Sequence, residues 1–471
     1  MYTLITGGTV VNATGTGLAD VLVEDEKIVA VLEPGSAVLG DTFLSGVDRR
    51  IDATGKYVIP GGIDAHTHME MPFGGSFASD SFETGTRAAA WGGTTTIIDF
   101  SVQYAGQDVL TQFAAWHEKA AGRCAVDYAF HQIIGGVDDV SLAAMDTLID
   151  EGVSSFKLFM AYKGVFLSDD GQIVQAMQRV SNNGGLLMMH AENGSVIDLL
   201  QQQALQRGDT DPIHHGLTRP WQTEEEATYR AIRLAELTGA PLYVVHVSAK
   251  QAVQRIAEAR DTGQNVFGET CPQYLWLSLE EQLGAPGFEG SKWVCSTPLR
   301  SRADGHQEHM WRSLRTNDLQ LVSTDHCPFC MKGQKEMGVG DFTKIPNGIG
   351  SVEHRLDLIY QGVVTGKISL ERWVEICCTT PARMFGLYGT KGVIQPGADA
   401  DVVVYDPAGH TSISVESHHM NLDYSAWEGF EVDGHVDVVL SRGKVLIADG
   451  EYHGRPGHGR YVKRGLSQYL I

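Results

Sequence analysis

Eight short apolar segments alternate with helix-like segments between residues 57 and 326 of this chain. They are rich in β-branched and aromatic residues, and they lack the polar alternation of a half-exposed strand. Such strands are typical of a parallel sheet that is covered by helices on both faces. In chain order the segments read YVIPGGIDAH, TTTIIDF, VDYAFHQII, SSFKLFMA, GLLMMHAE, PLYVVHVS, NVFGETCP and LQLVSTDH.

The segments between them have the features of helices. EEEATYRAIRLAELTG, for example, begins with acidic residues, carries apolar residues at helical spacing and stops at Gly239, a residue suited to a C-terminal cap. Repeated strand–helix units of this kind match a (β/α)8 barrel, which takes about 250 residues. We therefore predict an α/β fold with a TIM-like (β/α)8 barrel, and a doubly wound sheet is the alternative.

The two ends of the chain differ from its middle in the pattern of their apolar runs. Residues 1–56, and later GADADVVVYDP and VDVVLSRGKVLIADGEY, show short strand-like runs broken by Gly, Asn and Asp. We interpret them as two parts of one small antiparallel β-sandwich beside the barrel. The predicted domains are residues 1–56 and 389–450 for the sandwich and 57–388 for the barrel. Residues 451–471, rich in Gly, Arg and His, are predicted to form a tail or an oligomer contact.

Charge and composition narrow the class of partner. A formal net charge of −22 argues against nucleic acid and against a membrane surface as the main partner. No apolar run approaches the roughly 20 residues that span a bilayer, and the N-terminal residues lack the pattern of a signal peptide. We interpret the seven cysteines as reduced thiols; Cys327 and Cys330 lack the second pair that a zinc site needs. A cytoplasmic protein is expected.

Residues able to bind a metal ion stand at the ends of four of the apolar segments. They are His66, His68, His190, His246 and Asp325. Because the C-terminal ends of barrel strands form one face, these side chains are expected to converge there. Each alone has a simpler interpretation, since an H-x-H pair is a weak signal, a histidine can be a core residue and an aspartate can cap a helix. Their shared position at strand ends favours a metal site.

Lys157 lies inside the fourth apolar segment. A buried ammonium without a partner is costly, although a lysine at a strand end can also extend to solvent. Four histidines and one carboxylate suit two metal ions, about 3.5–4 Å apart, better than one catalytic zinc. Two ions favour a bridging anion, which a neutral lysine amine can supply by taking up CO2 to form a carbamate. Burial lowers the pKa of the amine and keeps it neutral for this reaction.

Eight ordered motifs add a family resemblance. HTHMEMPFGG, SFKLFMAYKG, MHAENG, VVHVSA, GETCPQYL, CSTPLR, STDHCPF and IPNGIGSVEHR resemble the dihydropyrimidinase/hydantoinase family of the amidohydrolase superfamily, and most of all its bacterial hydantoinases. The resemblance covers nearly the whole chain, including both parts of the small β domain. It implies a homotetramer, or a dimer, that hydrolyses a small cyclic amide with two divalent ions, zinc or else manganese or cobalt.

The resemblance also implies the metal ligands. Lys157 matches the lysine that the family carboxylates, with CO2, to N6-carboxylysine as the bridge between two ions. The ligands of the more buried ion would be His66, His68 and Asp325, and those of the more exposed ion His190 and His246.

Further positions match the substrate contacts of the family. Tyr162 matches a tyrosine whose hydroxyl stabilises the oxyanion, a donor worth about 2.7–4 kcal/mol in the transition state. Ser296 and Asn347 match residues whose backbone binds the cyclic amide; Thr297 stands where proline is expected, which leaves the alignment of Ser296 open. Loops after the first and fourth strands would surround the exocyclic group of the ring, and ordinary core packing is the alternative for their apolar residues. These residues are Met71, Phe73, Phe159 and Phe166.

The reaction implied by the resemblance is the opening of a ring by water. A metal-bridging hydroxide would attack the ring carbonyl, while Asp325 takes up the proton as general base and returns it to the leaving nitrogen as general acid. Hydantoins or dihydropyrimidines would open to N-carbamoyl amino acids. The apolar residues of these loops suit an uncharged ring with a hydrophobic substituent. We therefore predict a preference for 5-substituted hydantoins, often with D-selectivity.

Other functions on a related fold are the alternatives. Dihydroorotases carry an arginine two positions after the H-x-H pair to bind a substrate carboxylate, whereas this chain has Glu70. Allantoinase stays open as another hydrolase of cyclic ureides. A non-catalytic tetrameric scaffold of the collapsin-response type is disfavoured, because its members have lost metal ligands and all six ligand positions are intact here.

Overall fold

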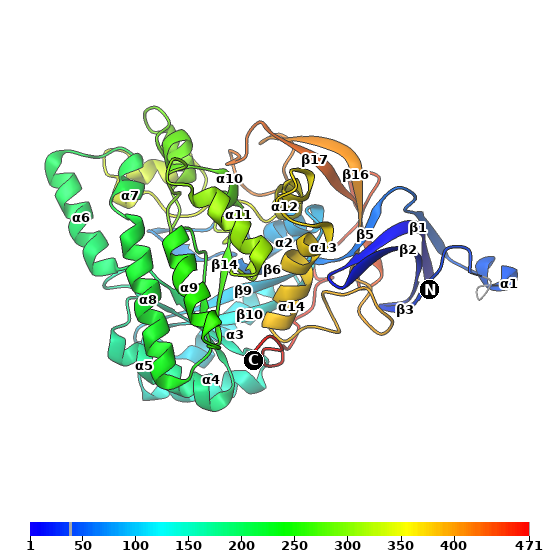
Figure 1. The fold of residues 1–471 in the computed structure, drawn as a ribbon, viewed down its shortest axis with the longest axis horizontal. Coiled ribbons are helices and arrows are strands. Elements are labelled where there is room, and N and C mark those ends of the chain that lie inside the picture. The colour runs from blue at the N-terminus through cyan, green and yellow to red at the C-terminus, as the bar shows by residue number, and fades with distance from the viewer. Residues whose placement is uncertain (37–39, 471) are drawn as a thin grey trace.

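Parallel strands form a barrel in the part of the chain that the structure, a computed structural model, describes: residues 1–36 and 40–470 (Figure 1). Each strand pairs with the next one in the sequence, which confirms the predicted barrel. The amide of His68 donates to the carbonyl of His326 at 2.8 Å and joins the first strand to the last. The strands are β6 (Gly62–Thr67), β9 (Thr94–Tyr104), β10 (Asp127–Gly135), β11 (Ser155–Phe159), β12 (Leu186–His190), β13 (Leu242–Val244), β14 (Val266–Thr270) and β15 (Leu321–Val322).

Helices surround the barrel on its outer side (Figure 1). α8 (Trp221–Thr238) is the helix expected from the acidic start and the Gly239 stop, and Gly239 caps it with a φ of 69°. The larger helices around the barrel are α2 (Phe82–Trp91), α3 (Val109–Ala120), α4 (Asp139–Asp150), α5 (Asp170–Asn183), α6 (Gly194–Arg207), α9 (Lys250–Asp261), α11 (His306–Thr316) and α12 (Arg355–Val364). Shorter ones are α7 (Ile213–Leu217), α10 (Pro272–Trp276), α13 (Leu370–Val374) and α14 (Thr380–Met384), whereas α1 (Asp41–Leu44) lies away from the barrel, beyond the second sheet (Figure 1). None of the described helices is both long and apolar enough to cross a membrane.

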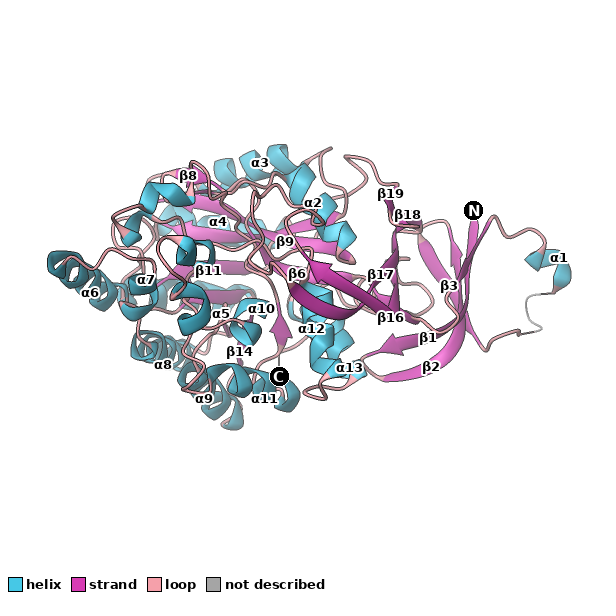
Figure 2. Ribbon diagram, turned by 90° about the horizontal axis from the view of Figure 1, so that it is seen from above, coloured by secondary structure: helices cyan, strands magenta, loops and turns pink. Residues whose placement is uncertain are grey.

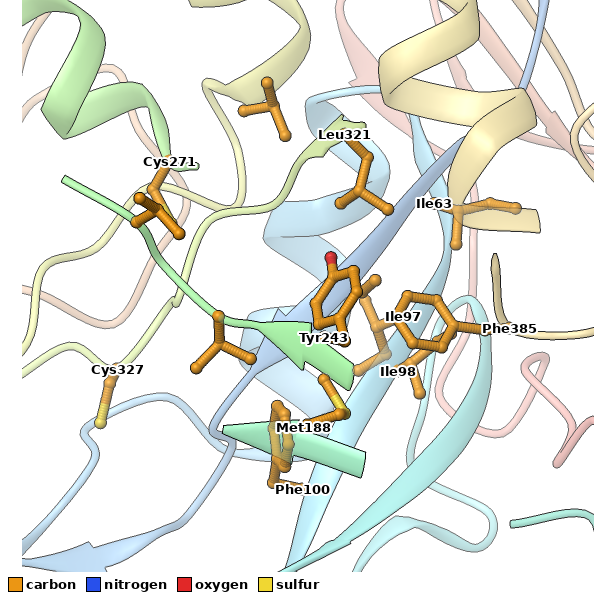
Figure 3. Close-up of a cluster of buried hydrophobic side chains, with 14 of the residues drawn as sticks. Ile63, Ile97, Ile98, Phe100, Met188, Tyr243, Cys271, Leu321, Cys327 and Phe385 are labelled. Carbon is orange, nitrogen blue, oxygen red and sulfur yellow. The ribbon is translucent and has the colours of Figure 1, made fainter. Parts of the chain in front are cut away.

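A cluster of buried apolar side chains packs in and around the barrel strands (Figure 3). Ile63, Ile97, Met188, Tyr243 and Leu321 come from five different strands and are at most 1% exposed. Barrels of this type are filled by such layers of side chains and leave no pore. The core therefore forms a rigid base below the strand ends that carry the polar residues.

A second sheet, built from both ends of the chain, lies beside the barrel (Figures 1 and 2). Its order is β19-β18-β17-β16-β5-β1-β2-β3, with β4 paired to β1, and most of its pairs are antiparallel. The described strands are β1 (Tyr2–Asn12), β2 (Gly15–Glu24), β3 (Lys27–Leu32), β4 (Arg49–Asp52), β5 (Tyr57–Pro60), β16 (Val402–Ile413), β17 (Phe430–Ser441), β18 (Lys444–Ala448) and β19 (Glu451–Tyr452). Residues 37–39 and 471, in the predicted segments 1–56 and 451–471, lie outside the described residues.

β16 shows how this sheet attaches to the barrel. Val402 and Val404 pack in a small core of the sheet itself, whereas Val403 and Tyr405 pack in the large core shared with the barrel. Successive side chains of a strand point to opposite faces, so one apolar strand serves both cores.

The first predicted barrel strand, residues 57–66, is two strands in the structure. β5 pairs with β1 and β16 of the second sheet, and only β6 belongs to the barrel. The chain changes sheet at Gly61, where a Cβ atom would lie 2.0 Å from the Thr95 hydroxyl oxygen. A continuous apolar run does not reveal this change, because both halves are buried.

The C-terminal segment packs against the bottom of its own barrel. The amide of Tyr128 donates to the carbonyl of Arg460 at 3.0 Å, and the amide of Val462 donates to the carbonyl of Tyr128 at 2.8 Å. The buried Arg464 donates to the carbonyl of Phe130 at 2.5 Å. A contact of this tail with another subunit stays a prediction.

A buried cluster of charges links the barrel to the second sheet. The Lys391 ammonium lies 2.6 Å from the carboxylate of Asp127 on β10, 2.9 Å from Asp399 and 2.7 Å from Asp401. Lys391 is 2% exposed, so these charges are screened little by solvent.

We predict that Lys391→Met lowers the free energy of unfolding by about 3–5 kcal/mol, because the buried Asp401 carboxylate loses the ammonium that pairs with it at 2.7 Å. Lys27→Met is the matched control: Lys27 also pairs with Asp399, at 2.7 Å, but its side chain is 50% exposed. The control should cost less than about 1 kcal/mol. Urea unfolding measures both, and equal losses would contradict this interpretation.

Candidate active site

The predicted site residues meet at the C-terminal end of the barrel. One narrow cavity there is lined by all of them except His66, which lies fully buried behind it. The residues around the cavity are His68, Met71, Phe73, Lys157, Phe159, Tyr162, Phe166, His190, His246, Ser296, Asp325, Cys327 and Asn347.

The first group of predicted metal ligands contains His66, His68 and Asp325. Asp325 Oδ1 lies 3.1 Å from His66 Nε2 and 3.2 Å from His68 Nε2. Lys157 Nζ lies 3.0 Å from the same His66 nitrogen. Strand β6 contains His66 and is followed directly by His68, β11 contains Lys157, and Asp325 lies in the segment after β15. Barrel closure therefore gathers four donor atoms.

The second group is the pair His190 and His246. Nδ1 of His190 lies 2.9 Å from Nε2 of His246, and Nε2 of His190 lies 2.8 Å from the carboxylate of Glu192. Burial lowers the pKa of His246 well below its usual range and that of His68 to about 3. Neutral imidazoles keep a lone pair free, which is the form that binds metal ions.

Lys157 is buried among aromatic rings and makes no ion pair with the described residues. Its Nζ lies 4.4 Å from the ring centre of Phe100 and 5.0 Å from that of Phe159. Burial lowers the pKa of Lys157 to about 8, although Asp325 and Glu269 act in the opposite direction. The neutral amine is thus a minor form at pH 7, although it is far more abundant than for an exposed lysine.

The donor set fits two divalent ions. Around a tetrahedral zinc with ligands about 2.0–2.2 Å away, ligand atoms lie about 3.3 Å from one another. Asp325 Oδ1 lies 3.1–3.2 Å from the Nε2 atoms of His66 and His68, and the facing nitrogen atoms of His190 and His246 are 2.9 Å apart. Lys157 lies in the same cavity as both groups.

Two carboxylates that sequence reasoning missed support the histidines. Glu269 on β14 contacts Nδ1 of His66 and also accepts a hydrogen bond from the Tyr243 hydroxyl at 2.8 Å. Glu192 contacts His190 as described above. Such partners fix the tautomer and orientation of a ligand histidine. Their signal in the sequence was the acidic residue in GETCP and in MHAENG, near the ends of predicted strands.

Three residues around the cavity have a left-handed backbone. Tyr162, His246 and Asp325 have φ values of 64°, 41° and 53°. This region is uncommon for residues other than glycine, and such strain concentrates at functional sites. The turn at each strand end aims the side chain into the cavity.

Tyr162, Ser296 and Asn347 form a polar edge of the cavity. The amide of Asn347 donates to the Ser296 hydroxyl oxygen at 3.0 Å. Burial, and then the nearby Glu192, raise the pKa of Tyr162 to about 12, so its hydroxyl stays protonated. Thr297, where proline was expected, donates a hydrogen bond from its hydroxyl to the carbonyl of His246 at 2.9 Å and thereby holds the backbone of a predicted metal ligand.

Aromatic rings form an apolar edge of the cavity. Phe159 stacks on Phe166 with ring centres 4.9 Å apart, and Phe73 meets Tyr162 edge-on at 5.3 Å. Phe73 ends the short hairpin strand β7 (Pro72–Phe73), which pairs with β8 (Ser76–Phe77). A wider cleft of about 840 Å³ continues outward past this hairpin.

A family model described as the amidohydrolase family matches residues 57–446. The chain belongs to this family. It is 60% identical to a D-hydantoinase of Streptomyces coelicolor over 468 residues, 99% of each chain. It is 49% identical to a D-hydantoinase of Geobacillus stearothermophilus over 466 residues, 98% of this chain and 97% of the other. The crystal structure of dihydropyrimidinase from Brevibacillus agri matches 99% of each chain with 48% identity and a TM-score of 0.95.

These likenesses confirm the resemblance that the ordered motifs indicated. The matches extend beyond the barrel of this amidohydrolase into both parts of the second sheet, as the coverage of nearly the whole chain requires.

We predict that Glu269→Gln weakens zinc binding by about 10–100-fold, because His66 loses a charged partner that orients its ring. Competition with a chelator measures the affinity. Tyr243→Phe is the control, since it removes only the hydrogen bond to the other oxygen of Glu269. An unchanged zinc affinity in Glu269→Gln would contradict the role of this carboxylate.

Proposed function

We propose that this amidohydrolase hydrolyses the cyclic amide bond of 5-substituted hydantoins, and of dihydropyrimidines, to N-carbamoyl amino acids. The observation that carries the proposal is the shared cavity of Lys157, the two histidine groups and Asp325, bordered by a polar and an apolar edge. The names of the relatives, D-hydantoinase and dihydropyrimidinase, support the same class of substrate.

Two divalent ions, zinc in our proposal and manganese or cobalt as alternatives, would be held in this cavity. When bound, such ions lower the pKa of a water molecule between them and polarise a carbonyl group. We propose that the Lys157 amine forms a bond with the carbon of CO2 and loses a proton, which gives a bridging carbamate. The remaining ligands are His66, His68 and Asp325 for one ion, and His190 and His246 for the other.

Asp325 is the proposed proton carrier. Burial acts to raise the pKa of Asp325, but His66 and His68 outweigh it and hold that pKa well below its usual range. The side chain is thus a carboxylate that can accept a proton from the attacking water. It then returns this proton to the ring nitrogen as the carbon–nitrogen bond breaks.

The two edges of the cavity would orient the ring. The Tyr162 hydroxyl donates a hydrogen bond to the carbonyl oxygen on which negative charge develops, and the backbone at Ser296 and Asn347 binds the ring amide. Met71, together with the aromatic edge, receives the substituent. An apolar edge of this kind favours a hydrophobic group over a charged one.

Substrate comparison tests the proposal directly. The zinc-loaded protein is expected to show a higher kcat/KM on 5-phenylhydantoin than on hydantoin or dihydrouracil, because the aromatic edge binds the phenyl group. Allantoin serves as the comparison for the alternative activity. A strong preference for dihydrouracil would contradict the hydantoinase part of the proposal, and a preference for allantoin would replace it.

Lys157→Ala should lose both metal ions and the activity, because the bridging anion is absent. Short carboxylic acids added to the variant should restore part of both, since a carboxylate can occupy the place of the carbamate. Elemental analysis measures the metal content; full zinc content in the variant would exclude Lys157 as the bridge.

Tyr162→Phe should lower kcat by about 10²–10³-fold, the usual effect of removing one oxyanion donor. Its metal content should stay that of the unchanged protein, because the hydroxyl is not a proposed ligand. Steady-state kinetics together with elemental analysis separate these effects, and a nearly unchanged kcat would remove Tyr162 from the mechanism.

A further inference from the structure

Lys335 is a buried cation outside the metal-ligand groups. It begins a short 3-10 helix, Lys335–Gly338, and its side chain is fully buried. Its ammonium donates to three backbone carbonyls and so uses all three of its donors. The acceptors are Val294 at 3.0 Å, Pro346 at 2.7 Å and Gly348 at 2.9 Å.

The three carbonyls belong to the two segments that form the polar edge of the cavity. Val294 lies two residues before Ser296, while Pro346 and Gly348 lie on either side of Asn347. The amide of Gly348 also donates to the carbonyl of Val294 at 2.9 Å. One ammonium therefore holds the backbone of both segments at a fixed separation.

The same segments pack tightly on the chain that follows β15. A Cβ atom on Gly348 would lie 1.9 Å from the carbonyl oxygen of Cys327, two residues after Asp325. The amide of Cys327 donates to the carbonyl of Ile349 at 3.3 Å. The Asn347 segment is thus anchored on the chain after Asp325, and Lys335 holds the Ser296 segment to it.

The stability of the fold does not account for a cation at this place. Lys335 makes no ion pair with any described carboxylate, and a buried charge without a counter-ion is costly. Burial lowers the pKa of Lys335 to about 7, which reflects this cost. An apolar side chain of similar volume would avoid the cost but could not bind three carbonyls.

We infer that Lys335 is a positioning residue for substrate binding, which sets the distance between the Ser296 and Asn347 backbones that bind the ring amide. The inference rests on the proposed function, because it takes the ligand of these backbones to be a cyclic amide. Lys335 touches no metal ligand and no proposed proton carrier. Its loss should therefore weaken binding of the ground state and of the transition state alike, which raises KM and leaves kcat nearly unchanged.

Lys335→Met and Lys335→Gln test this role in the zinc-loaded protein with 5-phenylhydantoin. We expect KM to rise about tenfold or more in Lys335→Met and by less in Lys335→Gln, because glutamine keeps two hydrogen-bond donors. In both variants kcat should stay within about threefold of that of the unchanged protein. Zinc content should be unchanged. Lys332→Met is the matched control, since Lys332 lies on the same segment with an exposed side chain, and its KM should stay within about twofold.

Hydrogen exchange supplies a readout that does not depend on turnover. Amides in residues 294–300 and 345–349 should exchange faster in Lys335→Met than in the unchanged protein, while the barrel strands keep their protection. An unchanged KM in a folded Lys335→Met would overturn the inference. Loss of zinc or of the fold in both Lys335 variants would also overturn it, because the residue would then act on stability and not on substrate binding. No turnover of any hydantoin by the unchanged protein would instead contradict the proposed function.

Discussion

The closure of the barrel between β6 and the end of β15 is the contact on which the site depends. The backbone hydrogen bond from His68 to His326 joins the first strand to the last. As a result, Asp325 lies within 3.2 Å of the nitrogen atoms of His66 and His68, although these residues are far apart in the sequence. Without the contact between these two strands, the protein would keep its helices and most of its strand pairs, but Asp325 would be separated from the two histidines.

Burial gives the gathered groups their chemical states. The same apolar surroundings keep Lys157 partly neutral, hold His68 and His246 as neutral rings and keep the Tyr162 hydroxyl protonated. Desolvation penalises whichever form of a group is charged, so one environment acts on acids and bases in opposite directions. Asp325 stays charged, because the imidazoles beside it outweigh its burial.

The supporting residues show where sequence reasoning reached its limit. The ligand histidines could be predicted because they end apolar strands of one predicted barrel. Glu269 and Lys335 could not, since each acts on a partner whose position is set by the fold: Glu269 on a histidine of another strand, and Lys335 on backbone carbonyls of two loops. Every residue has a backbone carbonyl, so the sequence does not reveal which carbonyls accept hydrogen bonds from a side chain. The split of residues 57–66 into two sheets was missed for a related reason, because burial in either sheet favours the same apolar residues.

The sequence by itself determined the barrel, the second β domain made from both chain ends and the set of groups at the strand ends, since apolar periodicity and residue type are local properties. Tertiary structure decided which of those groups meet. It placed the Asp325 carboxylate 3.1–3.2 Å from two histidines and turned Tyr162, His246 and Asp325 inward through left-handed backbone. It also brought three backbone carbonyls within hydrogen-bond distance of the Lys335 ammonium. These are distances between segments remote in the chain, and they are set only when the strands pair and the core packs.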